Sequence, residues 1–232
     1  MSEILEKVSG IKHIPIFPLP LVMLPNELLP LHIFEDRYRE MLRDVEREEK
    51  FFGVLLFEPD GYFADKPPFG RIGCLAEIRE SELLPDGRSN ILTLGVVRFR
   101  LLEYVDSEKP YLVGDVEFFE DEKGDAAELG PLSDEVFGLF ERMAKAAFSI
   151  SGNRGQFPQI QRTDPESLSF LITAAFNFDN EKKYVLLEKT STADRLHELK
   201  TMLTSAVGQM EENADILVVS RSNGHANKKI NF

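Results

Sequence analysis

The sequence predicts an α+β protein in which an antiparallel β-barrel subdomain with one inserted helix precedes an α-helical bundle. In the first half, apolar residues recur at every second position in short runs, and turn residues separate those runs. In the second half, apolar residues recur at helical spacing. We therefore place the barrel at residues 12–120 and the bundle at 131–212, and we expect flexible termini at 1–11 and 220–232.

Five runs of strand character support the barrel. They lie at residues 12–17, 51–57, 72–79, 91–104 and 111–119. The fourth run is long for one strand and contains Gly95, which indicates a bulge or a sharp bend. Before it, Leu84-Pro-Asp-Gly-Arg88 is a turn sequence, because proline presets φ and glycine accepts a positive φ. Such strands, with no regular strand–helix alternation, favour a closed or strongly curved antiparallel sheet.

Helical spacing marks the inserted helix and the bundle. One apolar stripe predicts the inserted helix and consists of Phe34, Tyr38, Met41, Leu42 and Val45. By composition, residues 121–130 are a linker, and helices are expected at 132–150, from Asp164-Pro165 onward, at 180–188 and from Ser191 onward.

Charge and composition exclude several classes of protein. The 27 basic residues are outnumbered by 40 acidic ones, and the net charge of −13 argues against a nucleic-acid partner. The single cysteine, Cys74, allows no intramolecular disulfide and is expected to be a small core residue. The sequence contains no apolar run of membrane-spanning length and no signal peptide pattern, so we expect no membrane partner and a cytoplasmic location.

No recognisable catalytic centre or cofactor site emerges from the motifs. The four histidines and one cysteine lack the spacing of zinc ligands, and neither a phosphate-binding P-loop nor a nucleophile elbow is present. We therefore expect no catalytic residues, no metal and no cofactor. Arg98 and Arg100 alternate around Phe99, and we interpret them as outward-facing charges on a half-buried sheet.

Apolar residues in proline-rich and loop segments are the candidate binding surface. Large apolar and aromatic side chains in such segments are typical of protein-recognition surfaces. The candidates for protein binding are Leu21, Met23, Leu24, Tyr62, Phe63, Pro67, Pro68 and Phe69. The alternative is that these loops fold over an open barrel end and bury their apolar groups, as most apolar residues do.

The amino-terminal third also resembles a known family. The segments Pro15–Pro25 (PIFPLPLVMLP) and Leu29–Met41 (LPLHIFEDRYREM) closely resemble the opening of the amino-terminal, substrate-binding domain of the Lon protease. Further similar segments follow in the same order, including Glu82–Arg88 (ELLPDGR) and Gly95–Arg100 (GVVRFR). The resemblance covers about residues 12–212 and implies a PUA-like β-barrel followed by an α-helical bundle.

The resemblance implies a non-enzymatic module that binds unfolded or partner proteins, with a role in proteolysis or quality control. Full Lon continues into an ATPase and a Ser–Lys peptidase, and this sequence ends at Phe232 before either, so we expect no enzyme activity. Alternatives are an RNA-binding PUA-like protein, which the charge disfavours, and a small-molecule-binding barrel. The family-motif residues that we interpret as structural are Pro18, Leu19, Pro30, Ile33, Phe34, Arg37, Tyr38, Gly95, Arg98 and Phe99.

Overall fold

A computed structural model describes residues 2–58, 66–151, 157 and 159–224, with the backbone alone for 213–224. The chain divides into two compact units. The first contains Met1–Glu122 and Phe170–Thr190, and the second contains Lys123–Ser169 and Ser191–Phe232. No helix in the described part of the chain is long and apolar enough to cross a membrane.

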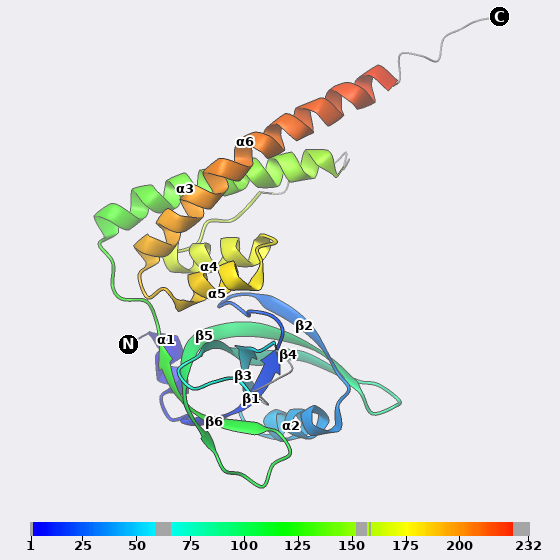
Figure 1. Ribbon diagram of the computed structural model, residues 1–232, viewed down its shortest axis with the longest axis vertical. Helices are drawn as coiled ribbons and strands as arrows, with labels where there is room; N and C mark the ends of the chain where they lie inside the picture. Colours follow the sequence, from blue (N-terminus) through cyan, green and yellow to red (C-terminus); the bar gives the residue numbers. More distant parts are fainter. Residues whose placement is uncertain (1, 59–65, 152–156, 158, 225–232) are drawn as a thin grey trace, which may run out of the picture. The chain divides into compact units, whose positions relative to one another are not determined.

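The first unit contains the sheet. Its strands are β1 (His13–Leu19), β2 (Leu28–Ile33), β3 (Phe51–Leu56), β4 (Ile72–Leu83), β5 (Ser89–Val105) and β6 (Leu112–Phe119). They are arranged in the order β2-β5-β4-β3-β1-β6, and β5 also pairs with β6, which closes the barrel (Figure 1). All pairs are antiparallel except β1 with β3. The expected antiparallel barrel thus contains one parallel pair, and the chain between its two strands, which includes β2 and a helix, forms the long crossover that parallel strands need.

The strand β5 is long enough to pair with both β2 and β6. Its first half pairs with β2 and its last half pairs with β6, while β4 lies along both. The register shifts between Cys74 and Ala76 of β4, where the paired residues on β5 move from Arg98 to Gly95. This is the bulge that Gly95 predicts, and a Cβ atom there would lie 2.1 Å from the carbonyl oxygen of Leu24.

Two helices belong to the amino-terminal part of the first unit. The first, α1 (Glu3–Val8), has Ser2 as its N-cap and buries Val8, so these residues form a helix that the sequence did not predict, and the flexibility expected at 1–11 stays a prediction. The inserted helix α2 (Asp36–Arg47) buries Tyr38, Met41, Leu42 and Val45 against the barrel. Phe34 was expected in this apolar stripe, but it precedes the helix and is 60% exposed.

The remaining helices are α3 (Ala126–Ile150), α4 (Pro165–Ala175), α5 (Asn180–Glu188) and α6 (Thr192–Gly224). The first begins six residues earlier than expected, because Asp125 caps it and Pro131 is tolerated inside it. The expected caps of the other two long helices are present, since Asp164 accepts from the Ser167 N–H and Ser191 accepts from the Asp194 N–H.

The helical half does not form one separate body as the sequence suggested. Most of α4 and all of α5 belong to the first unit, where Phe170, Tyr184 and Leu187 complete an apolar cluster with Leu24 and Ile72. Within α4, Phe170 is 1% exposed, whereas the adjacent Leu171 is 40% exposed. The helices α3 and α6 form the second unit with the beginning of α4.

Candidate functional site

An exposed apolar area lies on the outer side of β2 and β5. Residues that face each other across antiparallel strands point to the same side of the sheet, and Leu28 faces Leu94 while Pro30 faces Leu92. Leu28 is 59% exposed, and Leu92 and Leu94 are half-buried. The opposite side of β2 carries Leu29, Leu31 and Ile33, which pack towards the core.

Phe34 extends this area at the end of β2. Its ring is 60% exposed and stacks on the His32 ring at 6.1 Å between centroids. His32 is held in place because its Nδ1 lies 2.8 Å from Oδ1 of Asn90 on β5. We call the surface formed by Leu28, Pro30, Phe34, Leu92 and Leu94 the apolar face.

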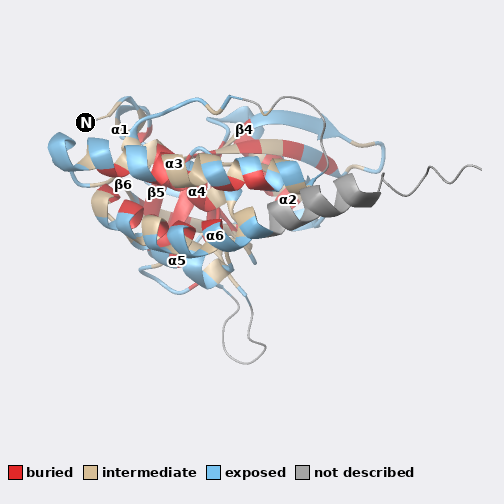
Figure 2. Cartoon of the chain, turned by 90° about the horizontal axis from the view of Figure 1, so that it is seen from above, coloured by how far each residue is buried: buried red, intermediate tan, exposed pale blue. Residues whose placement is uncertain are grey.

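Carboxylates border the apolar face along β4. Glu77, Glu80 and Glu82 pair with Leu94, Leu92 and Asn90 of β5, so their side chains point to the same side of the sheet. The last five residues of β4 are all exposed, unlike its buried first half (Figure 2). Glu77 pairs with Lys7 and Arg79, whereas Glu80 and Glu82 have no ion-pair partner among the described residues.

The predicted binding residues of the proline-rich segment are largely buried. Met23 is 1% exposed and Leu24 is completely buried, while Leu21 is half-buried against the core. The structure therefore realises the alternative of packed loops at Met23 and Leu24, because α2, α4 and α5 supply apolar partners for them. Neither side chain offers a surface to a partner.

The second predicted segment is divided between core and surface. Tyr62 and Phe63 lie outside the described residues, and Pro67 is buried. The Tyr104 hydroxyl donates to the Pro67 carbonyl oxygen at 2.7 Å, and burial raises the pKa of Tyr104 to about 12. Pro68 and Phe69 are exposed, and the Phe69 ring lies 5.7 Å from that of Tyr104. Their role in binding stays a prediction.

A groove of about 490 Å³ lies beside Pro68 and is distinct from the apolar face. Leu56, Pro68 and Val185 supply apolar walls, and Arg71 and Glu58 supply charges. The guanidinium of Arg71 stacks 3.9 Å from the centroid of Tyr184, whose hydroxyl accepts the N–H of Ile72. Pro68 and residues of α5 line this groove together, within the first unit.

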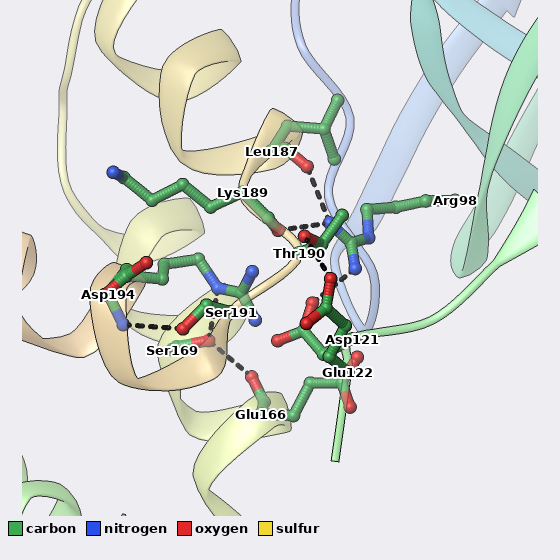
Figure 3. A network of polar contacts seen from close by, with 11 residues as sticks. Arg98, Asp121, Glu122, Glu166, Ser169, Leu187, Lys189, Thr190, Ser191 and Asp194 are labelled. Carbon is green, nitrogen blue, oxygen red and sulfur yellow. Dashed lines mark hydrogen bonds and ion pairs between the residues drawn. The ribbon is translucent and has the colours of Figure 1, made fainter. Parts of the chain in front are cut away.

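Arg98 is buried, which corrects its interpretation as an outward-facing charge. It is 1% exposed, and its Nη1 donates to the carbonyl oxygens of Leu187 at 2.9 Å and Lys189 at 2.5 Å (Figure 3). Its Nη2 pairs with Asp121, whose side chain is 2% exposed. Its guanidinium also lies 5.2 Å from the ring centroid of Phe170. Arg98 therefore holds the ends of α5 and β6 inside the first unit.

The other motif residues divide between buried and exposed positions, and their structural role stays a prediction. Pro18 and Leu19 belong to β1, and Ile33, Tyr38 and Phe99 are buried. Arg37 pairs with Glu35 at 2.8 Å and stacks 4.5 Å from the Tyr38 centroid. Pro30, Phe34 and Arg37 are exposed, and the first two belong to the apolar face.

Sequence reasoning missed Leu28, Leu92 and Leu94 as surface residues. The signal was present as the alternation of Leu28, Pro30, His32 and Phe34 around a proline, which is typical of an edge strand. Phe34 was expected in the apolar stripe of the inserted helix. For that reason the strand alternation of residues 28–34 was not recognised.

In the described residues, potential metal ligands are dispersed and the single thiol is buried. These residues contain no group of three or more His, Cys, Asp or Glu side chains that could hold a metal ion. Cys74 is fully buried, and burial raises the pKa of its thiol well above the ordinary value, which disfavours the reactive thiolate.

Comparison with known proteins identifies one family. A family model described as the ATP-dependent protease La (LON) substrate-binding domain matches residues 13–205. The Lon protease of Azorhizobium caulinodans is 27% identical over 202 residues, which cover 85% of this chain and 23% of that protein. The Lon protease of Dictyoglomus thermophilum is 24% identical over 205 residues, with 85% and 25% covered. The chain thus spans about a quarter of the length of these curated relatives.

Two solved structures are similar to the chain. A Lon N-terminal domain protein from Xanthomonas campestris gives a TM-score of 0.59 at 25% identity, covering 82% of this chain and 97% of that one. The N-terminal domain of the Mycobacterium avium complex Lon protease gives a TM-score of 0.64 at 18% identity, covering 83% and 98%, and supports the fold alone. Since the family model spans most of the sequence, the protein belongs to the LON substrate-binding domain family.

Proposed function

We propose that this protein binds exposed apolar segments of other proteins, and that the apolar face is the surface that receives them. The exposure of Leu28 and Phe34 at 59% and 60% supports this proposal most directly. Large apolar side chains gathered on one side of a sheet, beside carboxylates, are typical of an interaction site. The family model that matches this chain describes a substrate-binding domain, which agrees with a binding role.

The free energy available from burying these side chains favours weak binding of low sequence specificity. Burying a large apolar side chain contributes about 1.5–3 kcal/mol, so the exposed parts of Leu28 and Phe34 supply about 2–4 kcal/mol together. Micromolar affinity requires about 8 kcal/mol, so further contacts must contribute. A surface of this kind suits many apolar segments better than one particular ligand.

The test uses a permanently unfolded protein, such as reduced and carboxymethylated α-lactalbumin, with binding measured by fluorescence anisotropy. The double variant Leu28→Ser/Phe34→Ser should weaken binding by about tenfold or more, since 1.4 kcal/mol corresponds to a factor of ten. Its melting temperature should hardly change, because both side chains are exposed.

Leu102→Ser is the matched control, since Leu102 is 46% exposed on β5 but lies outside the apolar face. Equal binding by the double variant, the control and the unchanged protein would refute the proposed surface.

A further inference from the structure

We propose that the apolar face receives its substrate as an added β-strand along the free edge of β2, and that the preferred segment is extended, apolar and flanked by Lys or Arg. This inference rests on the proposed function and specifies both the substrate class and the way in which it binds.

The edge of β2 is open to an additional strand. Within the described residues, β2 pairs with β5 and with no other strand, so it ends the sheet. The Gly95 N–H donates to the Glu27 carbonyl oxygen at 2.9 Å, which places the hydrogen-bonded pairs with β5 at Leu29, Leu31 and Ile33. The backbone groups of the intervening residues therefore point away from β5, towards the free edge.

Pro30 fits this geometry. It occupies one of the positions that face the free edge, so its missing N–H removes no hydrogen bond between β2 and β5. The edge then offers the N–H groups of Leu28 and His32 and the carbonyl oxygens of all three residues. A strand that pairs with this edge gains directional hydrogen bonds in addition to apolar burial, which the side chains alone do not supply.

Side chains of the added strand would extend the apolar face. Adjacent strands lie about 4.8 Å apart, and every second side chain of the new strand points to the same side as Leu28 and Pro30. Phe34 lies at the end of this row, where its exposed ring can cover one apolar substrate side chain. Alternate apolar residues in the substrate are therefore the expected pattern.

The negative charge of this surface favours basic residues beside the apolar residues of the substrate. Glu80 and Glu82 border the apolar face and are exposed, and neither has an ion-pair partner in the described part of the chain. The chain as a whole carries a net charge of −13. The added strand lies three strand spacings, about 14 Å, from β4, so long Lys or Arg side chains are attracted towards these carboxylates across the apolar face and Asp or Glu is repelled. Over this distance the attraction requires low salt.

The first experiment measures binding of fluorescent twelve-residue peptides in which Leu or Val alternates with Ser and Lys stands at both ends. Backbone N-methylation is placed on two interior residues, at either odd or even positions. Because successive N–H groups of a strand point to opposite edges, one set should weaken binding about tenfold or more and the other should have little effect. Equal effects of the two sets would overturn strand addition.

A matched pair of protein variants tests the same edge. His32→Pro removes an N–H from the free edge, whereas His32→Ala keeps it, and both remove the ring that stacks on Phe34. Only the proline variant should lose affinity for the Lys-ended peptide. If that variant fails to fold, the N-methylated peptides decide the question.

The third measurement compares peptides ended by Lys with peptides ended by Glu. At low salt the Lys-ended peptide should bind several-fold more tightly, and the double variant Glu80→Gln/Glu82→Gln should reduce that difference. A preference for the Glu-ended peptide would overturn the proposed substrate class. A dimer that dissociates when the peptide binds would identify a second copy of this chain as the occupant, and would also overturn it.

These outcomes separate the inference from the function on which it rests. If Leu28→Ser/Phe34→Ser weakens binding but N-methylation at odd and even positions acts equally, the apolar face binds without strand addition. If the double variant binds normally, the proposed function itself fails.

Discussion

Arg98 shows at the scale of one residue why charge alone does not predict position. The sequence places it on a strand between Val97 and Phe99, and alternation assigned it to the outside. The structure buries it because the carboxylate of Asp121 and two carbonyl oxygens satisfy its guanidinium. Those partners lie 23, 89 and 91 positions away along the chain, so no local pattern could have revealed them.

Replacing Arg98 by Met should lower the free energy of unfolding by about 3–5 kcal/mol, because the buried Asp121 carboxylate and the carbonyl oxygens of Leu187 and Lys189 lose the guanidinium that they bind. Arg100→Met is the control: Arg100 is half-buried and makes one 3.3 Å hydrogen bond to Gly70, so we expect a loss below about 1 kcal/mol. Urea unfolding measures both. A loss for Arg98→Met no larger than that of the control would contradict the role given to this ion pair.

Tyr104 gives a prediction that depends on pH. Burial raises its pKa to about 12, whereas an unfolded tyrosine ionises near ~10. The unfolded state therefore loses this proton first, and the contribution of the neutral phenol to stability is complete below about pH 10 and declines between about pH 10 and 12. Tyr104→Phe should be less stable than the unchanged protein at pH 8, because the hydrogen bond to Pro67 is lost. The difference should shrink above pH 10, and a difference that grows instead would show that the sign is wrong.

At the scale of elements, β5 is the strand that the sequence described best. Its length and Gly95 predicted a bend or bulge, and the register shift opposite Cys74 and Ala76 confirms it. The edge position of β2 could not be read in the same way, because it depends on which strands pair across the closed barrel. The early start of α3 was missed because acidic and small residues at 121–130 resemble a linker in composition.

Gly95→Ala should destabilise the protein by about 2 kcal/mol or more, since the new methyl group overlaps the Leu24 carbonyl and the backbone must move. Gly138→Ala is the contrasting substitution, because Gly138 lies inside α3 and the position that its new methyl group would take has no neighbouring atom within 4 Å. Alanine there should stabilise by about 0.5–1 kcal/mol. Thermal unfolding of the two variants should therefore shift in opposite directions. A shift in the same direction would show that close approach to Leu24 does not explain the glycine.

At the scale of the whole molecule, the division into a barrel and a helical part was predicted, but the membership of α4 and α5 was not. Their amphipathic patterns show that they bury apolar residues without showing against what. The buried residues Phe170, Tyr184 and Leu187 pack with Leu24 and Ile72, so a segment distant in sequence belongs to the barrel unit. The same packing explains why Leu24, a predicted binding residue, is in the core.

A fragment of residues 1–122 should therefore fail to unfold cooperatively, because the apolar cluster around Leu24 loses the side chains that close it. Near-ultraviolet circular dichroism and thermal melting test this. Adding a peptide of residues 165–190 should restore part of the signal, and the same peptide with Phe170→Ser should not. A fragment that melts as sharply as the full chain would show that residues 170–190 contact the barrel but are not needed for its cooperative folding.

The late arrival of Phe170–Thr190 also affects the order of events during synthesis. At about 5–20 residues per second, a ribosome needs roughly 3–14 s to translate from Glu122 to Thr190. During that interval the nascent barrel leaves Leu24 and Ile72 uncovered, and Arg98 lacks the carbonyl oxygens of Leu187 and Lys189. The emerging chain would thus itself need protection by a chaperone until Thr190 has been added.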